Sequence, residues 1–320
     1  MNFLAILAAL GLEQWRTFRL RAGVERLFVR YARWLELQLN GGTREQGMVA
    51  ALAALALPVA LAAGLFWLAS AVHPALGFVW NVVVLYLLMG FRQFSGAFSA
   101  IAAALAAGDL AIARRALAGW RGGTPTEWSS TDVARLAIER GFVDSYRHVF
   151  GTLFWFVLLP GPAGAVLYRA AALLAAEWHA GASGEDTTPL IRTRESFGAP
   201  ARRLLWLLDW IPARLTALSF AIVGDFEDAA YCWRTQASAW AEEEGGDVAG
   251  IVLAAGGGAL GVTLGGPLPT VAGAPEGRPE LGMGEDPDAA LMSSGVGLVW
   301  RALILWLLLI LLLTLANLAP

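Results

Sequence analysis

Residues 48–72 read MVAALAALALPVALAAGLFWLASAV, 25 consecutive positions without a charged side chain. A helix needs about 20 mostly apolar residues to cross the hydrocarbon core of a bilayer, so this stretch predicts a transmembrane helix. Pro58 lies within it, and a helix in lipid tolerates proline better than a helix in water does. This stretch decides the fold class, because a chain with such a helix is an integral membrane protein.

The composition of the whole chain agrees with a membrane protein. Hydrophobic residues make up 57% of the 320 positions, charged residues 15%, and the mean hydropathy is +0.57. A soluble domain has about 25% charged residues. Further apolar runs cover residues 75–91, 142–178, 204–224 and 299–318. We therefore predict an all-α, polytopic membrane protein with about four to five membrane segments.

Two of the later apolar runs are interrupted. Pro160-Gly161-Pro162 divides the run 142–178 and predicts two short spans or a re-entrant hairpin. In the run 204–224, Asp209, Pro212 and Arg214 lie within otherwise apolar sequence. Ionisable groups at membrane depth are costly and mark functional sites. This part of the chain is therefore predicted to enclose a polar pocket.

Basic residues are unevenly distributed along the chain. All 23 are arginine; positions 13–47 hold seven of them, and positions 92–147 hold another seven. The positive-inside rule places both segments in the cytoplasm. Positions 225–298 contain two arginines and twelve acidic residues, but the rule weakens for loops longer than about 60 residues, so the side of this segment stays open.

These patterns predict six segments. Residues 1–47 resemble no cleavable signal peptide and are predicted to form a basic amphipathic helix on the membrane surface. The segments that follow are a transmembrane hairpin (48–91), a cytoplasmic helical insert (92–147), an interrupted membrane core with a polar pocket (148–224), an acidic Gly/Pro-rich loop (225–298) and a C-terminal transmembrane helix (299–320). Within the insert, we expect one helix over 98–120 and another that Ser129 or Ser130 caps.

Several kinds of site are excluded or disfavoured. Cys232 is the only cysteine, and the three histidines lack the spacing of zinc ligands. Without lysine the chain has neither a Walker A motif nor a Schiff-base lysine. Residues 256–261 formally match the dinucleotide fingerprint, but the following LGGPLP cannot continue as a helix. A flexible glycine loop or a backbone nest for an anion remain as alternatives there. Nucleic acid is not an expected partner, whereas the lipid bilayer is.

A series of short tracts carries a resemblance to a known family. They are Phe154-Trp155, Tyr168-Arg169-Ala170, Phe197-Gly198, Arg203-Leu204, residues 210–217, residues 258–267 and Trp300-Arg301-Ala302. In this order and with several of these spacings, the chain resembles the CobD/CbiB family of cobalamin-biosynthesis membrane proteins and its relative AmpE. The tracts around Pro212 and Gly265 are the most specific.

The resemblance implies an amide-forming step that joins an aminopropanol-type amine to a carboxylate of cobyric acid, a corrinoid, with ATP and Mg²⁺ as the expected cofactors. It implies that arginines hold phosphate or carboxylate groups. The residues expected to do so are Arg169, Arg203, Arg214 and Arg301. Gly265 and Gly266 would line the activated group, and Glu139, Asp144 or Asp209 would ligate metal or transfer a proton. Which residues bind a metal stays open.

Departures from the family pattern favour an alternative. Family synthases carry an E-N-x-x-D stretch, and here its places hold Val143, Asp144 and Arg147. The paired aspartates after Arg203-Leu204 are replaced by Leu205 and Trp206. AmpE-like proteins share such losses and the tract 208–210. The alternative is therefore a non-enzymatic AmpE-like regulator of β-lactamase induction or cell-wall signalling, with a signalling partner. Against it, such chains lack the L-G-G-P loop at 264–267. A transporter component is a weaker third hypothesis.

The ionisable candidates also have structural explanations. Asp209 and Arg214 would neutralise each other at the bilayer edge. Arg169 and Arg301 would extend their charges from span ends to the interface. Asp144 and His148, one helical turn apart, form either a general-base pair or part of a solvated helix face.

Overall fold

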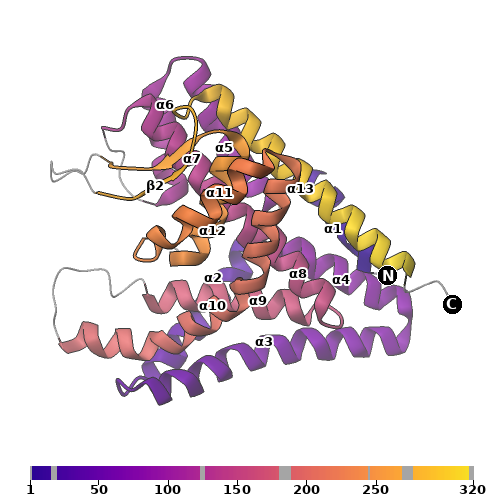
Figure 1. Ribbon diagram of the computed structural model, residues 1–320. Helices are drawn as coiled ribbons and strands as arrows, with labels where there is room; N and C mark the ends of the chain where they lie inside the picture. Colours follow the sequence, from indigo (N-terminus) through magenta and orange to yellow (C-terminus); the bar gives the residue numbers. More distant parts are fainter. Residues whose placement is uncertain are drawn as a thin grey trace. The chain divides into compact units, whose positions relative to one another are not determined.

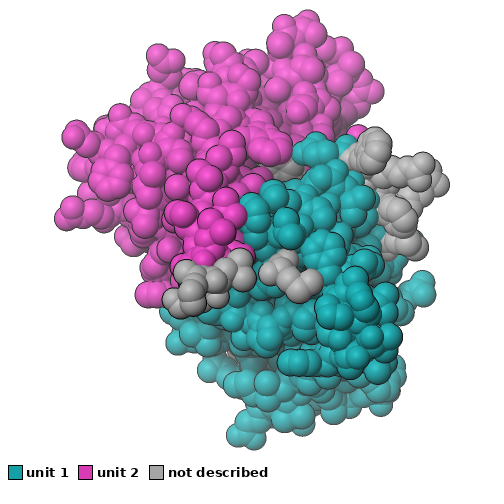
Figure 2. All heavy atoms as spheres, turned by 90° about the vertical axis from the view of Figure 1, so that its right-hand side faces the viewer, with its two compact units in different colours: residues 1–89, 151–209 teal, residues 90–150, 210–320 magenta. Residues whose placement is uncertain are grey.

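The computed structural model describes residues 2–15, 20–122, 127–179, 189–243, 246–268 and 277–316. They form two compact units, one made of residues 1–89 and 151–209, the other of residues 90–150 and 210–320. Figure 2 colours the two units separately. Helix α10 (Pro189–Val223) contributes its first part to unit 1 and its second part to unit 2.

Unit 1 is entirely helical in its described residues. Besides the first part of α10, it contains α1 (Asn2–Trp15), α2 (Leu20–Leu39), α3 (Arg44–Val72), α4 (Pro74–Leu88), α8 (Gly151–Leu158) and α9 (Ala163–His179). The residues expected to form one amphipathic N-terminal helix thus form two helices. The reason is packing: α1 is apolar and lies against α4 with Ala5, Ile6 and Ala9 buried, whereas α2 is the amphipathic one.

Helices α3 and α4 run side by side as a hairpin (Figure 1). The side chain of Thr43 caps the start of α3, and His73 ends α3 while its Nδ1 accepts from the amide of Ala75 at the start of α4. The indole of Trp80 donates to the carbonyl of Ala62 over 3.0 Å and ties the two helices together. At 29 residues, α3 is about 44 Å long, enough to span a bilayer.

Within the described residues, three helical stretches are long and apolar enough to cross a membrane: Arg44–Val72, Glu195–Val223 and Ala289–Ala316. Large apolar side chains such as Leu52, Leu61 and Trp67 on α3 are more than half exposed, as expected for a surface that faces lipid. Shorter apolar helices accompany them, including Pro74–Leu88 and Gly246–Leu260. These features confirm the prediction of an all-α polytopic membrane protein.

The Pro160-Gly161-Pro162 break is a turn between two packed helices, α8 and α9. Gly161 has a φ of 65°, and Gly164 lies so close to the carbonyl of Trp155 that a Cβ there would be 1.9 Å from its oxygen. With eight and 17 residues, the two helices are shorter than the three candidate spans. Two short helices joined by a turn agree with both predicted alternatives, two short spans or a re-entrant hairpin, so this choice stays a prediction.

Unit 2 combines helices with a small antiparallel ribbon. Besides the end of α10, it contains α5 (Phe91–Ala106), α6 (Leu110–Arg121), α7 (Ser130–Ser145), the π-helical turn η1 (Tyr146–Phe150), α11 (Phe226–Gln236), the 3₁₀ turn η2 (Ala237–Trp240), α12 (Gly246–Leu260), β1 (Thr263–Gly265), β2 (Glu280–Gly282) and α13 (Ala289–Ala316). Its core includes Phe142, Phe150, Phe220 and Trp306, whose rings contact one another.

Of two helix predictions within unit 2, one is confirmed and the other is wrong. Ser129 caps α7 in a reciprocal capping box with Asp132, which confirms the predicted helix start. The single helix expected over 98–120 is instead two helices, because α5 ends at Ala106 and the side chain of Asp109 caps the start of α6.

The segment 225–298, expected to be a loop, contains α11, η2, α12 and the ribbon of β1 and β2. The sequence did not predict α12 because glycine, which is frequent in it, is unfavourable in helix interiors. Here the glycines allow close packing: a Cβ on Gly256 would lie 2.7 Å from the ring of Phe142, and one on Gly258 would lie 2.5 Å from the carbonyl oxygen of Asp228. Tertiary contacts therefore outweigh the low helix propensity.

Candidate functional site

The candidate site in unit 2 is centred on Glu139, a buried acid on α7. Its two carboxylate oxygens accept hydrogen bonds from the two Nη atoms of Arg278, each over 2.9 Å. The amide of Gly265 donates to the same carboxylate over 2.7 Å. A two-point arginine–carboxylate pair fixes orientation as well as charge. Glu139 thereby anchors the ribbon of β1 and β2 to α7.

Gly265 and Gly266 have backbone conformations that favour glycine, with φ values of 69° and 75°. A Cβ on Gly265 would lie 2.1 Å from the carbonyl oxygen of Pro279, so this position also lacks the space for a side chain. The amide of Gly266 donates to that same carbonyl, and the carbonyl of Gly266 accepts from Nε of Arg278 at 3.3 Å. The two glycines thus place the L-G-G-P loop directly against Arg278.

A cavity of about 250 Å³ lies beside this pair. Four arginines line it, Arg121, Arg140, Arg147 and Arg278, together with the acids Glu139, Glu242 and Glu243. The Arg278 guanidinium also lies over the ring of Trp240, 5.1 Å from its centroid, which holds it at the wall. Guanidinium groups bind phosphate and carboxylate with matching planar geometry. The cavity can therefore hold an anionic ligand.

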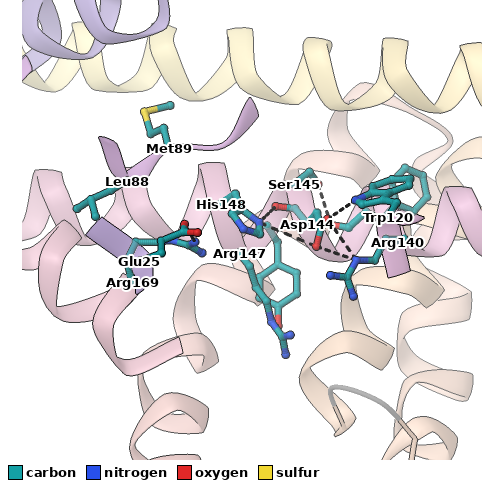
Figure 3. Close-up of polar contacts among 12 residues, drawn as sticks. Glu25, Leu88, Met89, Trp120, Arg140, Asp144, Ser145, Arg147, His148 and Arg169 are labelled. Carbon is teal, nitrogen blue, oxygen red and sulfur yellow. Dashed lines mark hydrogen bonds and ion pairs between the residues drawn. The ribbon is translucent and has the colours of Figure 1, made fainter. Parts of the chain in front are cut away.

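Asp144 lies one and a half turns after Glu139 on α7, and its carboxylate is buried. Trp120 donates to it over 3.0 Å, and Nε of Arg140 lies 3.2 Å from one of its oxygens. The ring nitrogen Nδ1 of His148 is 4.0 Å from the same carboxylate (Figure 3). Burial raises the pKa of the Asp144 carboxyl, and the charge of Arg140 opposes that rise. The solvated-face alternative is wrong for this side chain.

Asp209 is a buried acid in unit 1. The hydroxyl of Tyr168 donates to its carboxylate over 2.6 Å, and both side chains are buried. One residue earlier in the same helix, the carbonyl of Leu208 accepts from the indole of Trp155 over 3.0 Å. Pro212 has no N–H to offer that carbonyl four residues back in the helix, so the indole supplies the missing donor. Tyr168 of the Tyr-Arg-Ala tract and Trp155 of the Phe-Trp tract thus bind the part of α10 that directly precedes Pro212.

Arg169 is buried and forms an ion pair with Glu25 at 3.6 Å (Figure 3). Glu25 is also 3.3 Å from Arg21, which in turn donates to the carbonyls of Leu88 and Met89 at the end of α4. The expectation that Arg169 extends its charge to the interface is therefore wrong. Its charge is neutralised within unit 1, where it links α9 to α2.

The other arginine candidates are more exposed. Arg203 lies in unit 1, with its guanidinium 4.8 Å from the ring centroid of Trp206. Arg214 is in unit 2, where it donates to the carbonyl of Trp210 over 2.9 Å and lies over that residue's ring. Arg301 is exposed and its Nε donates to the carbonyl of Gly297. Their substrate-binding roles stay predictions.

Of the predicted site residues, the structure brings Glu139, Gly265 and Gly266 together, with Asp144 on the same helix. Arg278, which holds these parts in place, was missed. The segment 225–298 contains two arginines and twelve acidic residues, and Arg278 is one of the two. A rare basic residue in an acidic segment was the only pattern that could have indicated Arg278 from the sequence. The cavity arginines Arg121 and Arg140 were missed too, since they were interpreted only as cytoplasmic charge.

Residues 256–261 do not form a dinucleotide site. They lie at the end of α12 and in the turn before β1. The order is helix–turn–strand, whereas the fingerprint needs strand–turn–helix. Neither proposed alternative describes this segment, because Gly256, Gly257 and Gly258 are buried within a helix. Among the described residues, no group of three or more His, Cys, Asp or Glu side chains forms a metal-binding cluster.

Comparison of this sequence with a family model and with curated proteins gives the same family in each case. The sequence model of the family described as "CobD/Cbib protein" matches residues 9–299. A relative in Stutzerimonas stutzeri named "Cobalamin biosynthesis protein CobD" is 37% identical over 97% of both chains. Proteins with the same name in Chromobacterium violaceum and Rhodobacter capsulatus are 40% and 31% identical, over 80% and 81% of this chain and 76% and 78% of theirs. No solved structure gives a significant match.

Proposed function

The chain belongs to the CobD/CbiB family, and we propose on this basis that it forms an amide bond in cobalamin biosynthesis. The proposed substrates are a carboxylate of cobyric acid and an aminopropanol-type amine or its phosphate. The observation that carries the proposal is the cavity with four arginines beside the fixed Glu139–Arg278 pair. The relatives reported above are all named as cobalamin biosynthesis proteins, so the alternative of an AmpE-like regulator has no support.

The cavity suits this chemistry because the carboxylate of cobyric acid, the phosphate form of the amine and ATP all carry negative charge. A propionate-type carboxylate, an amine phosphate and the triphosphate of ATP all form charge-assisted hydrogen bonds with guanidinium groups. Arg121, Arg140 and Arg147 line the cavity; Arg140 also pairs with Asp144, and Arg147 also donates to the hydroxyl of Tyr146. These three arginines are the proposed anion-binding residues. Glu139 and Arg278 are positioning residues that hold the L-G-G-P loop at the wall.

The residues present fit Mg²⁺ and ATP in charge and donor type. Magnesium usually takes one or two carboxylates and completes its coordination with phosphate oxygens and water. Glu242 and Glu243 line the cavity and are the proposed carboxylates, while the arginines would hold the phosphates. When bound, ATP would supply the activation of the substrate carboxylate. We propose that these two glutamates take the place of the lost family acids.

Amide formation also requires the amine to lose a proton. Asp144 is the proposed acceptor, with His148 beside it, because it lies on the same helix as Glu139 and pairs with the cavity arginine Arg140; burial also raises the pKa of its carboxyl. Trp120 and Arg140 hold the carboxylate in place from two other sides. Asp209, Arg169, Arg203, Arg214 and Arg301 stay predicted site residues, to be tested singly.

The structure and the family fit a membrane protein. We propose the bacterial inner membrane as its location, with residues 1–47 and 92–147 in the cytoplasm. The argument is the positive-inside rule applied to the seven arginines in each of two segments that flank a membrane hairpin. In this orientation the cavity arginines Arg121, Arg140 and Arg147 would face cytoplasmic substrates.

The proposal is tested by a synthase assay on the purified protein in detergent. Adenosylcobyric acid, aminopropanol phosphate, ATP and Mg²⁺ are supplied, and the product is followed by mass, with an undiverged family member as positive control. Arg121→Gln should raise the KM for an anionic substrate by roughly ten- to a hundredfold, the equivalent of one charged hydrogen bond. Arg115→Gln, an exposed arginine on the same helix, is the matched control. No product beside a working control would refute the proposal.

A further inference from the structure

A second hollow lies in unit 1, where the start of α3 meets the first part of α10. It is an open groove of about 790 Å³, lined by Arg44, Glu45, Met48, Arg203, Leu204 and Leu207 among others. None of these residues takes part in the hydrogen bonds of the buried acids described above. The groove is therefore a separate feature, with its own charges and its own apolar wall.

Close backbone packing forms the base of this groove. A Cβ on Gly47 would lie 2.1 Å from the carbonyl oxygen of Phe197, so α3 and α10 touch there without side chains between them. Ala50, Ala51, Phe197 and Ala201 continue this contact in the buried core of unit 1. The shape of the groove is thus determined by a rigid helix–helix contact.

The two arginines of the groove stand at the ends of apolar stretches. Arg44 begins the candidate span Arg44–Val72, and Arg203 directly precedes the apolar run that starts at Leu204 within Glu195–Val223. The ring of Trp206 lies 4.8 Å from the guanidinium of Arg203, a contact that restricts this side chain. Arginine and tryptophan at span ends are typical of the headgroup level of a bilayer.

The apolar wall of the groove continues into a surface suited to lipid tails. Met48 and Leu207 are 52% and 53% exposed, and Leu52, one turn further along α3, is 59% exposed. A ligand that filled the groove would therefore meet the guanidinium groups of Arg44 and Arg203 and an apolar wall that includes Met48 and Leu207. This combination matches one class of molecule, an amphiphile with an anionic head.

We propose that this groove is a specific binding site for an anionic phospholipid, with its phosphate at Arg44 and Arg203 and its acyl chains along Met48, Leu204 and Leu207. Basic pockets between membrane helices bind acidic headgroups through the same charge attraction. A zwitterionic lipid fits less well, because its cationic headgroup would face the two guanidinium groups. Glu45 lines the groove as well and would repel a second negative charge, which favours a singly charged headgroup such as phosphatidylglycerol. This proposal assigns Arg203 to lipid in place of substrate, and it does not depend on the proposed enzymatic function.

The test is native mass spectrometry of the full chain released from nanodiscs that contain equal amounts of phosphatidylglycerol and phosphatidylcholine. The wild type should retain phosphatidylglycerol preferentially, and Arg44→Gln and Arg203→Gln should each lower that retention about fivefold. Arg44→Lys should keep it, because the charge remains. Arg115→Gln, an exposed arginine of unit 2, is the control.

Three results would overturn the proposal: equal retention of the two lipids by the wild type, unchanged retention in both Gln variants, or displacement of the lipid by cobyric acid, which would assign the groove to substrate. Should a Gln variant fail to fold, Leu207→Trp replaces it, since this half-exposed position tolerates a larger side chain that fills the groove. Leu207→Trp should lower the retention of phosphatidylglycerol by the same factor, and unchanged retention in this variant would contradict the proposed lipid site.

Discussion

Glu139 and Arg278 form a two-point ion pair, with each guanidinium Nη atom 2.9 Å from one carboxylate oxygen, although 139 positions separate them in the chain. Both side chains are less than a tenth exposed. The amide of Gly265 donates to the same carboxylate. The pair therefore joins α7, the L-G-G-P loop and the segment before β2 at a single point.

Removing the charge of one partner in the Glu139–Arg278 pair should lower the free energy of unfolding. Glu139→Gln leaves the buried charge of Arg278 without its counter-ion, which typically costs about 3–5 kcal/mol. Unfolding in detergent, followed by circular dichroism, measures the loss. The double variant Glu139→Gln/Arg278→Met should lose less than the sum of the two single variants, because no unpaired charge remains.

A surface ion pair provides the matched control for this experiment. Arg114 and Glu127 are 3.2 Å apart, but the Glu127 side chain is 94% exposed. Removing Glu127 should cost under about 1 kcal/mol. Equal costs for Glu139→Gln and Glu127→Gln would mean that the buried pair does not hold the loop to α7.

Asp144 should make the stability of the protein depend on pH. Burial raises the pKa of its carboxyl in the folded state above the ordinary value of 3.8. Below pH 3.8 the folded and unfolded states both hold the proton. As the pH rises, the unfolded state ionises first, so the contribution of Asp144 to stability is lost progressively until the pH passes the folded pKa.

The comparison with Asp144→Asn isolates this effect, because all other titrating groups are shared. The free energy of unfolding of the wild type, minus that of the variant, should fall as the pH rises from 3.8. Arg140→Gln should extend the fall to higher pH, because the charge of Arg140 is the strongest influence that lowers this pKa. A difference that rises with pH would show that the carboxyl is stabilised in its ionised form instead.

Two adjacent glycines should respond differently to alanine. Both have positive φ, which costs about 1–2 kcal/mol for any residue with a Cβ. At Gly266 the nearest atoms are 3.6 Å or more from the new Cβ, so Gly266→Ala should cost no more than this strain. At Gly265 the Cβ would also meet the carbonyl oxygen of Pro279 at 2.1 Å, and the loop must move away from Glu139.

Gly265→Ala should therefore lose clearly more stability than Gly266→Ala, and with it more of the synthase activity. Thermal unfolding and the product assay, run on both variants in parallel, measure the two effects. Since strain from positive φ is common to both, the difference between them reports the close contacts of position 265 with Pro279 and Trp240. Equal losses would contradict the close approach of the two segments.

Sequence pattern predicted the elements whose stability depends on local composition. The charge-free run 48–72 lies in α3, the described part of the run 299–318 lies in α13, and Ser129 caps α7. Each depends on residues next to one another in the chain. The resemblance supplied Glu139, Gly265 and Gly266 as site candidates, and the structure brings these three together.

The rest could not be predicted because it depends on contacts distant in sequence. Helix α12 forms in spite of Gly256, Gly257 and Gly258, since neighbouring elements pack directly against their backbone. Arg278 becomes a site residue only through a partner 139 positions away. No periodicity or propensity records such a pairing, and one sequence alone shows no covariation.

The carbonyl of Leu208 lacks its usual helical donor, because residue 212, four positions later, is a proline without an N–H. Trp155 donates its indole N–H to this carbonyl over 3.0 Å, and the carbonyl belongs to a buried residue. Trp155→Phe keeps an aromatic ring but removes the donor, so the carbonyl is left unsatisfied at a cost of about 1–3 kcal/mol. In a Pro212→Ala background the amide of residue 212 can bond to the carbonyl, and the same substitution should then cost less. Unfolding of the four proteins of this cycle gives a coupling energy of about 1–2 kcal/mol if the indole compensates for the proline. If Trp155→Phe costs the same in both backgrounds, the indole contributes packing alone, and the Phe-Trp tract is not there to satisfy the proline tract.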